Sequence, residues 1–405
     1  MPTLNKLGPR VCGRRPGTDP LLRLRAVLTV FFALDGFIFA GWVVRIPAIK
    51  TQTGASASAL GLALLGVSAG GVITMMLTGR LCRRYGSLPL TVLCAILLSL
   101  SVALPPLTRS APQLGAVLLV FGAAYGGLNV AMNSAAVDLV AALRRPVMPS
   151  FHAAFSLGGM LGSGLGGLVA GHLSPTRHLL ALTATGLLIT ALARPALLRH
   201  TPPAPVRPPE PRAPRPTEPA RPARATRATV LVFGVIALCT AYGEGALADW
   251  GALHLEQDLH AQPGLAAAGY ACFTLAMTIG RLCGTTLLER LGRTPLLVGG
   301  GLTAAAGMLL GSLAPATWAA LLGFGITGLG LANIFPVAVD RAGALTGPGG
   351  VAAASTLGYS GMVLGPPAMG FMADWFSLPS ALTSVAVLAA VAAAIGWTTR
   401  RADPA

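Results

Sequence analysis

The sequence predicts an all-α membrane protein with twelve transmembrane helices, arranged as two six-helix bundles. Of its 405 residues, 54% are hydrophobic and only 10% are charged, whereas a soluble domain carries about 25% charged residues. The apolar residues form continuous runs, and about 20 such residues cross the roughly 30 Å hydrocarbon core as a helix. Because the runs are continuous rather than alternating, they argue against a transmembrane β-barrel.

A segment rich in Pro and Arg, residues 201–227, divides the chain near its middle. Pro fixes the backbone and removes amide donors, and the segment holds too little apolar surface to offset its ordering entropy. We therefore predict an extended cytoplasmic linker that joins two bundles. The predicted parts are a basic tail (1–23), a first bundle (24–200), the linker (201–227), a second bundle (228–398) and a short tail (399–405).

Each of the two blocks contains six apolar segments, and each segment predicts one membrane-spanning helix. In the first block the segments are 24–46, 58–77, 88–107, 112–137, 149–173 and 177–198. In the second block they are 228–252, 264–287, 294–313, 317–339, 351–373 and 379–397. The pair Pro366 and Pro367 is expected to bend the eleventh span, since Pro clashes with the preceding helical turn. Residues 1–20 lack the apolar core and cleavage site of a signal peptide.

The net charge of +16 is explained by orientation in the membrane. Of the 29 Lys and Arg residues, all but Arg45, Lys50, Arg109 and Arg177 fall on the side of the tails and the linker. The positive-inside rule makes that side the cytoplasm. No nucleic acid partner is expected, because the chain has no folded basic module with base-reading groups. None of the six Cys forms a CxxC pair, so we expect free thiols, no metal and no cofactor.

The two halves of the chain repeat short motifs. In the fifth and eleventh spans, glycines recur at identical spacing: Gly158, Gly162 and Gly167 match Gly361, Gly365 and Gly370. After the second span the chain reads GRLCRRYGS, and after the eighth it reads TTLLERLGR; both place an Arg two residues before a Gly. Internal repeats of this kind are typical of secondary transporters.

These motifs resemble those of the Major Facilitator Superfamily, over almost the whole chain. The run from Glu289 to Arg293 resembles the family signature acid–Arg–x–Gly–Arg, whereas the first-half copy has Arg83 for the acid and Ser87 for the last basic residue. The segments HAAFSLG (152–158) and EGALADW (244–250) are similar to the fucose-permease-like branch of bacterial inner-membrane carriers. The resemblance implies a multi-pass carrier that works by alternating access. We expect a monomer in the lipid bilayer, with both termini cytoplasmic.

Acidic residues inside spans are the first candidates for chemistry, because an ionisable side chain there costs a few kcal/mol. Asp35 falls about 10 residues into the first span, near the membrane midplane. Glu244 lies in the seventh span, between two glycines that also permit a local break of the helix. We predict Asp35 and Glu244 as proton-coupling sites, together with His152 in the fifth span, since imidazole titrates near neutral pH. Each has a structural alternative, as a hydrogen-bonded buried carboxyl or a packed histidine.

A substrate cavity is predicted from amide and aromatic side chains. Asn129 and Asn133 lie four residues apart on one helix face, and Asn333 takes a similar place in the tenth span. Amides suit hydroxyl or amide groups of a small-molecule substrate, with helix–helix hydrogen bonding as the alternative. The aromatic candidates for stacking, each also explained by ordinary packing, are Tyr125, Phe155, Tyr242, Tyr270 and Tyr359.

Charged residues at the helix ends predict two gates. On the outer side, Trp42 and Arg45 end the first span and Asp249 and Trp250 end the seventh. Within the superfamily these spans meet, so Arg45 is predicted to pair with Asp249 or Glu244. The alternative is an interfacial Arg beside the aromatic belt.

On the inner side, we predict two quasi-symmetric pairs, Arg84 with Asp138 and Arg290 with Asp340. They would close the inner gate when the carrier opens outward, with Glu289 and Arg293 of the signature beside them. Such partly exposed pairs contribute modestly. The alternative is that each Arg marks the cytoplasmic face and pairs with lipid phosphate.

The function predicted is secondary active transport of a small polar solute, coupled to protons. By resemblance, the solute is a sugar or a related metabolite. An enzyme is not expected, because the sequence has no GxxxxGK[ST] or HExxH motif. Two alternatives stay open: a proton-coupled exporter of drugs or metabolites, and a receptor-like membrane protein that does not transport.

Overall fold

The computed structural model describes residues 20–145, 147–199 and 224–399, and every regular element in these ranges is a helix. The predicted tail as far as residue 19, the linker as far as residue 223 and the end of the chain from residue 400 lie outside the described residues. Helix α1 begins at Pro20 and α8 at Arg224. Residues 20–23 and 224–227 therefore belong to these helices rather than to the predicted tail and linker.

Twelve spans form two groups of six. The first half consists of α1 (Pro20–Val43), α2 (Ile46–Thr53), α3 (Ala57–Tyr85), α4 (Ser87–Ser101), η1 (Pro105–Leu107), α5 (Ala111–Leu143), α6 (Met148–Ala170) and α7 (Pro175–Leu198). The second half consists of α8 (Arg224–Gln257), α9 (Pro263–Leu282), α10 (Gly284–Leu291), α11 (Arg293–Leu313), α12 (Thr317–Leu331), α13 (Ile334–Thr346), α14 (Pro348–Trp375) and α15 (Leu378–Thr398). The helix α2 lies between spans one and two, while α9 with α10 and α12 with α13 each make one broken span.

Length and composition support membrane insertion. In the part of the chain that the structure describes, eleven helical segments are long and apolar enough to cross a bilayer. The remaining span is α14, whose many Gly, Ser and Pro residues make it less apolar. Large apolar side chains are exposed on the outside of both bundles, such as Met76 at 76% and Leu168 at 73%. Such a surface suits lipid rather than water.

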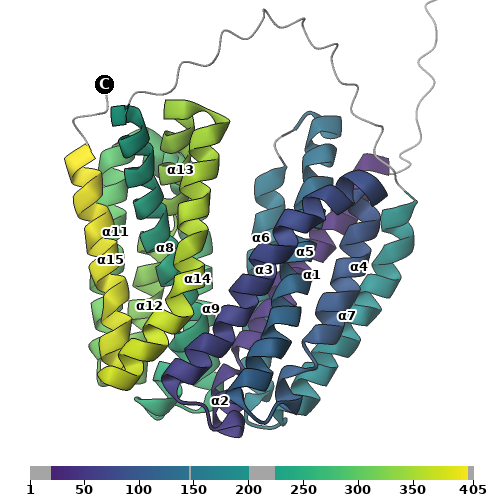
Figure 1. The fold of residues 1–405 in the computed structure, drawn as a ribbon, viewed down its shortest axis with the longest axis horizontal. Coiled ribbons are helices and arrows are strands. Elements are labelled where there is room, and N and C mark those ends of the chain that lie inside the picture. The colour runs from purple at the N-terminus through teal and green to yellow at the C-terminus, as the bar shows by residue number, and fades with distance from the viewer. Residues whose placement is uncertain (1–19, 146, 200–223, 400–405) are drawn as a thin grey trace, which may run out of the picture.

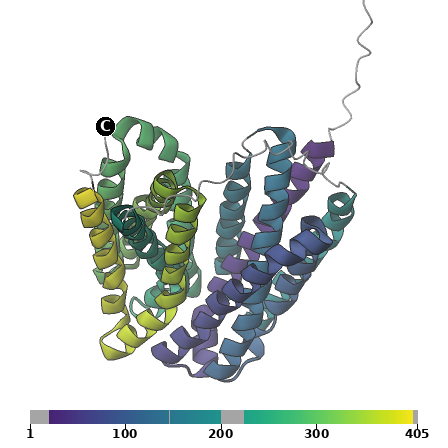
Figure 2. The ribbon, with the colours of Figure 1, turned by 45° about the horizontal axis from the view of Figure 1, so that its top comes forward.

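The two bundles converge at one end and separate at the other (Figures 1 and 2). We call the end where α7 finishes and α8 begins the linker end, and the opposite end, which carries α2, the far end. The halves contact each other through α3 with α14 and through α6 with α9. Both pairs cross near the far end, as the purple and yellow-green helices at the bottom of Figure 1 illustrate.

Glycines let the helices of each bundle approach backbone to backbone. In α6, Gly158 packs directly on the carbonyl of Ala33 in α1, and Gly162 packs on that of Phe37. In α14, Gly361 packs in the same way on the carbonyl of Leu238 in α8. Small residues at such crossings replace the hydrophobic driving force that is missing between helices in lipid.

The last glycine of each repeat contacts the other bundle instead of its own. Gly167 of α6 packs on Gly264 and Ala267 of α9, and Gly370 of α14 packs on Ala57 of α3. The same motif therefore builds each bundle and also joins the two bundles at the far end. The repeat in the sequence corresponds to a repeat in the packing.

The repeated loops after α3 and α10 share one backbone turn. Gly86 and Gly292 have φ of 89° and 81°, a region that glycine adopts without steric cost. Each ends one helix, and the next helix starts at the following residue, Ser87 or Arg293. The loop motif is a turn that reverses the chain at the linker end in both halves.

The sequence suggests local features for spans seven, one and eleven. The helix α8 runs unbroken through Glu244 and its neighbouring glycines, so no break occurs in the seventh span. The first span ends at Val43, and the chain turns through Arg45 into α2. The helix α14 continues as one helix through Pro366 and Pro367, and the carbonyl of Pro366 packs on Gly61 of α3.

We expect Gly158→Ala to lower the stability of the protein by about 1–3 kcal/mol, because the added methyl group meets the Ala33 carbonyl and the helices must separate. The matched control is Gly164→Ala in the same helix, where nothing lies within 4 Å of the added carbon. The control should be neutral or gain up to about 1 kcal/mol of helix propensity. Thermal unfolding of both purified variants in detergent measures the difference, and equal unfolding temperatures would contradict this packing.

Candidate functional site

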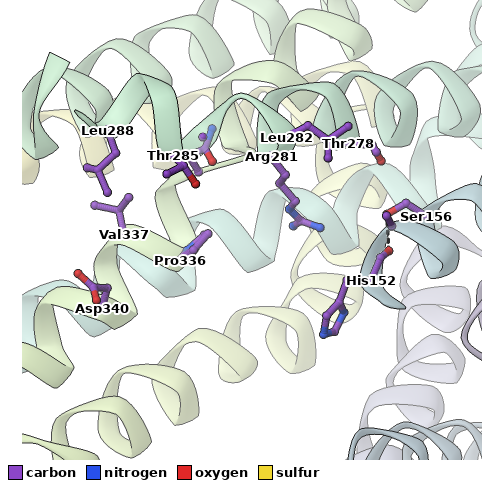
Figure 3. Close-up of a pocket in the computed structure, with 13 residues that line it drawn as sticks. His152, Ser156, Thr278, Arg281, Leu282, Thr285, Leu288, Pro336, Val337 and Asp340 are labelled. Atoms are coloured by element: carbon purple, nitrogen blue, oxygen red, sulfur yellow. Dashed lines mark hydrogen bonds between the residues drawn. The ribbon is translucent and has the colours of Figure 1, made fainter. Parts of the chain in front are cut away.

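A cavity of about 510 Å³ lies between the two bundles, in the half of the molecule nearer the linker end. Its first-half wall is α6 and its second-half wall is α9, α10 and α13 (Figure 3). The polar side chains that line it are His152, Ser156, Thr278, Arg281, Thr285, Asn333 and Asp340. Figure 3 shows Arg281 extending from α9 toward the α6 wall, which carries His152. A solute in this cavity would contact both halves of the protein.

The second-half wall is built from the two broken spans. The eighth span breaks at Cys283 and the tenth at Ala332 and Asn333, whereas their first-half counterparts α3 and α5 are continuous. Breaking a helix in a membrane frees backbone groups that need other partners. Transporters commonly place their binding sites at such discontinuous helices.

Two side chains bond to backbone groups at these breaks. The Asn333 amide donates to the Gly280 carbonyl at 2.8 Å, and Arg281 Nε donates to the Ala332 carbonyl at 3.4 Å. Gly284 has to be glycine here, because a Cβ would collide with the Asn333 amide oxygen. Each broken span thus bonds to the other, and this crossing holds Arg281 at the cavity wall.

Arg281 forms an ion pair with Glu244 of α8. Its Nη2 lies 3.1 Å and 3.3 Å from the two carboxylate oxygens. Glu244 itself does not line the cavity, but it contacts Arg281, which does. The sequence analysis did not single out Arg281 and counted it with the cytoplasmic charges. Its place inside the predicted eighth span, 264–287, was the available signal.

Asp35 is the second acid near the centre. It is fully buried in α1, and neither of its carboxylate oxygens has a hydrogen-bond partner among the described residues. Tyr125, an aromatic candidate of the same half, stacks against the rings of Phe39 and Phe121 in the first bundle.

The other predicted cavity residues lie elsewhere. Asn133 donates to the Asn129 carbonyl at 2.8 Å on one face of α5, and neither lines the cavity. The Tyr242 hydroxyl is 2.9 Å from Ser384 Oγ inside the second bundle. Tyr359 is 48% exposed on α14. Of the predicted site residues, the cavity wall carries His152, Asn333 and Asp340.

The predicted outer pair of Arg45 with Asp249 or Glu244 is not formed. Arg45 is buried in the first bundle, where its Nε donates to His178 Nδ1 at 2.8 Å and its Nη1 to the Ala170 carbonyl at 3.2 Å. The carbonyls at the end of α6 carry partial negative charge, which attracts the guanidinium more locally than an acid in the other bundle. Trp42 and Trp250 are likewise buried in the hydrophobic core rather than exposed at an interface.

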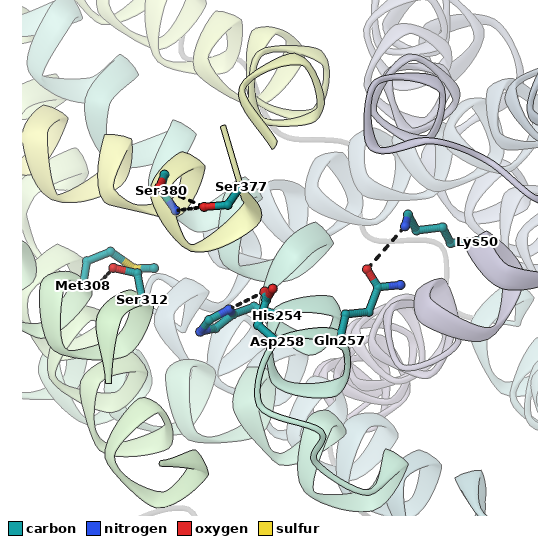
Figure 4. Close-up of polar contacts among 8 residues, drawn as sticks. All are labelled: Lys50, His254, Gln257, Asp258, Met308, Ser312, Ser377 and Ser380. Atoms are coloured by element: carbon teal, nitrogen blue, oxygen red, sulfur yellow. Dashed lines mark hydrogen bonds and ion pairs between the residues drawn. The ribbon is translucent and has the colours of Figure 1, made fainter. Parts of the chain in front are cut away.

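The far end is closed by a different set of polar contacts. The Asp374 carboxylate of α14 accepts hydrogen bonds from the backbone N–H groups of Ala57, at 3.0 Å, and Ser58, at 2.8 Å, where α3 begins. A negative charge is favourable at a helix N-terminus. Lys50 Nζ also donates to Gln257 Oε1 at 3.3 Å across the two halves (Figure 4). The sequence analysis missed Asp374, which follows the eleventh span.

At the linker end, the inner pairs that are predicted for the outward-open carrier are not formed in this conformation, in which the bundles are separated at that end (Figure 1). Asp340 pairs with Arg293 at 3.0 Å, within the second bundle, and not with Arg290. Arg84 stacks over the ring of Tyr85 and forms no ion pair with Asp138. In the first half Ser87 stands where Arg293 stands in the second, so Asp138 has no basic side chain at that position.

Comparison with known proteins places the chain in a family. The model of the Major Facilitator Superfamily matches residues 26–244 and 233–405. An uncharacterised MFS-type transporter of Yersinia pestis is 34% identical over 367 residues, which cover 90% of this chain and 92% of that protein. An uncharacterised transporter of Sinorhizobium fredii is 32% identical over 90% of this chain and 95% of its own length. These relatives are named as transporters and not as enzymes.

Solved structures share the fold. A bacterial homologue of the human lysosomal transporter Spinster has a TM-score of 0.75, with 16% identity, covering 96% of this chain and 98% of its own. A D-xylose–proton symporter has a TM-score of 0.73, with 17% identity, covering 94% and 98%. At these identities the likeness shows the twelve-helix fold alone.

We expect Asp374→Asn to loosen the closure at the far end. Losing the charge at the α3 N-terminus should lower the free energy of closure by about 1 kcal/mol. This corresponds to a roughly fivefold larger equilibrium constant for opening. Hydrogen exchange at the amides of Ala57 and Ser58 measures that opening. Asp258→Asn is the matched control, because Asp258 is a far-end acid that directly follows α8 and bonds to His254 of that helix, in the same half (Figure 4). Unchanged exchange in both variants would show that Asp374 does not hold the halves together.

Proposed function

The chain belongs to the Major Facilitator Superfamily, and from that membership we propose that it is a proton-coupled secondary transporter that moves a small polar solute by alternating access. The observation that carries the proposal is that the bundles are in contact at the far end, while a cavity lies between them nearer the linker end. The wall of this cavity carries Arg281, which forms an ion pair with Glu244 of α8. A rocking carrier requires such a site at the interface of two repeats.

We infer that the linker end faces the cytoplasm, so that this conformation is inward-facing. The basic side chains support this orientation. In the described part of the chain, the Lys and Arg residues at the far end are Arg45, Lys50, Arg109 and Arg177, and the others lie toward the linker end. Cytoplasmic loops carry such an excess. The protein would then be a multi-pass protein of the bacterial inner membrane.

The contacts at the far end are suited to reversal. Gly167 and Gly370 meet the opposite bundle through backbone surfaces, without interlocking large side chains. Asp374 adds one charge-assisted contact. For the carrier to open outward, these contacts separate while the linker ends of the bundles approach. A few kcal/mol are enough to reverse the populations of two such states.

Two acids serve the proposed proton coupling. An ionised carboxylate buried without a partner is costly, so we propose that Asp35 holds a proton in this conformation. Glu244 faces Arg281 at 3.1 Å and can exchange that partner for a proton. His152 lies on the cavity wall and is the proposed carrier of protons between the acids and cavity water.

The proposed solute is polar, and by resemblance to the fucose-permease-like branch it is a sugar or a related metabolite. The cavity wall supports a polar solute, because it offers a guanidinium, an imidazole, an amide and hydroxyl groups. An exporter of apolar drugs would favour an apolar and aromatic wall, and no Phe, Tyr or Trp is among the described lining residues. Neither the exporter nor the receptor-like alternative is favoured by a specific observation.

We expect solute binding to make the detergent-purified carrier take up about one proton from weakly buffered solution, because Glu244 exchanges its Arg281 partner for a proton. Glu244→Gln should abolish that uptake. The measurement is a screen of sugars, amino acids and drugs with a pH indicator. Asp35→Asn tests the second acid, and Asp258→Asn is the control that removes an acid away from the cavity. Solute binding without proton uptake in the wild type would exclude proton coupling.

A further inference from the structure

We propose that the transported solute carries a carboxylate, and that this carboxylate takes the place of Glu244 on the Arg281 guanidinium. The inference rests on the function proposed above and names the chemical class of its substrate. The solute would be a small hydroxylated acid of about the size of a sugar.

Arg281 is the fixed cation among the described residues that line the cavity. Its side chain is 44% exposed, although it is anchored at two of its three nitrogens. Nη2 binds Glu244 and Nε binds the Ala332 carbonyl, while Nη1 makes no hydrogen bond within the described chain. A guanidinium with a free edge binds a carboxylate through two parallel hydrogen bonds. The free edge extends toward the cavity (Figure 3).

The other charges around the cavity do not compensate Arg281. Asp340, the acid on the cavity wall, already pairs with Arg293 at 3.0 Å. Glu244 is therefore the acid that neutralises Arg281 in the empty cavity. When Glu244 takes up a proton, the guanidinium is left without a counter-ion in a partly desolvated wall, which is unfavourable unless an anion binds.

Proton and anion should consequently bind together. A proton on Glu244 raises the affinity of Arg281 for the solute, and by linkage the solute raises the affinity of Glu244 for the proton. When the proton leaves, Glu244 closes on Arg281 again and displaces the carboxylate. The conformation described here, with the Arg281–Glu244 pair closed and the cavity facing the linker end, has the geometry expected after release.

The remainder of the wall suits hydroxyl groups on the solute. Ser156 Oγ donates to the His152 carbonyl at 3.1 Å, and Thr278 Oγ1 donates to the Thr274 carbonyl at 2.8 Å. Their hydrogens are thus engaged within their own helices, and their oxygens can accept hydrogen bonds from the cavity. A solute that donates from several hydroxyl groups fits these acceptors. A volume of about 510 Å³ accommodates a molecule of sugar size.

The test compares acids with neutral partners of the same size. The probes are D-glucuronate with D-glucose, D-galacturonate with D-galactose, D-gluconate with D-glucitol, and D-glycerate with glycerol. Binding to the full-length purified carrier is measured by calorimetric titration at two pH values. We expect one acid to bind about 30-fold more tightly than its neutral partner, the ratio expected for a hydrogen bond to a charged group. Its affinity should fall as the pH rises.

Variants identify the group responsible. Arg281→Gln should abolish the preference for the acid, whereas Arg177→Gln, an exposed Arg at the far end, should keep it. Glu244→Gln should bind the acid with an affinity that no longer depends on pH. Because Arg281→Gln leaves Glu244 unpaired and can destabilise the fold, the double variant Arg281→Gln with Glu244→Gln removes both charges. The double variant should fold, and it should bind no acid more tightly than the neutral partner of that acid.

The outcomes separate the two proposals. Binding of no acid, equal binding of acid and neutral partner, or an unchanged preference in Arg281→Gln would each overturn the substrate class. A neutral solute that triggers proton uptake lost in Glu244→Gln would overturn the class while the proposed transport function stands. Acid binding that depends on Arg281 but takes up no proton would keep the class and overturn the coupling.

Discussion

Backbone hydrogen bonding governs where a membrane-spanning chain can depart from a continuous helix, and this protein departs from it at the cavity. In hydrocarbon, a carbonyl freed by a broken helix has no water to bond to. The breaks in spans eight and ten are therefore placed against each other, so that Asn333 satisfies Gly280 and Arg281 satisfies Ala332. Arg281, which bonds to the free Ala332 carbonyl, is also the cation that lines the cavity. Structure and chemistry depend on the same guanidinium, because its anchoring orients its free edge.

Glycine packing supplies the second constraint. The repeat in α6 and α14 uses its first positions inside each bundle, at Gly158 and Gly361, and its last position between bundles, at Gly167 and Gly370. The contacts inside a bundle are supported by neighbouring helices on several sides, whereas the contacts between bundles stand at one end of the molecule. One sequence motif therefore packs the helices within each half and also joins the two halves at the far end.

Hydropathy and charge were sufficient to predict the twelve-helix fold, because each span is an isolated apolar run and each turn carries its own signal, as at Gly86 and Gly292. The family resemblance is also confirmed. The sequence placed His152 and Asn333 among candidates that do line the cavity. The sequence alone did not predict which side chains form hydrogen bonds and ion pairs with each other. Arg45 bonds to a nearby carbonyl of α6 rather than to an acid in the other bundle, and Asp340 pairs with Arg293 rather than with Arg290. Such choices depend on side-chain direction in the folded helices. Arg281 was missed because a charge near a helix end is also explained by membrane orientation.

The two halves have similar folds and different chemistry. The second half breaks its eighth and tenth spans, whereas the first keeps α3 and α5 continuous and contributes a buried, unpartnered acid in α1. Ser87 in place of the basic residue found at Arg293 removes the corresponding pair from the first half. The repeat therefore preserves the glycine crossings and the turns, while the one fixed cation among the described cavity residues, Arg281, lies on the second-half wall. For the charged solute that we propose, such an asymmetric wall would fix the orientation, because the charged group would bind on one side of the cavity and the neutral part would meet the other.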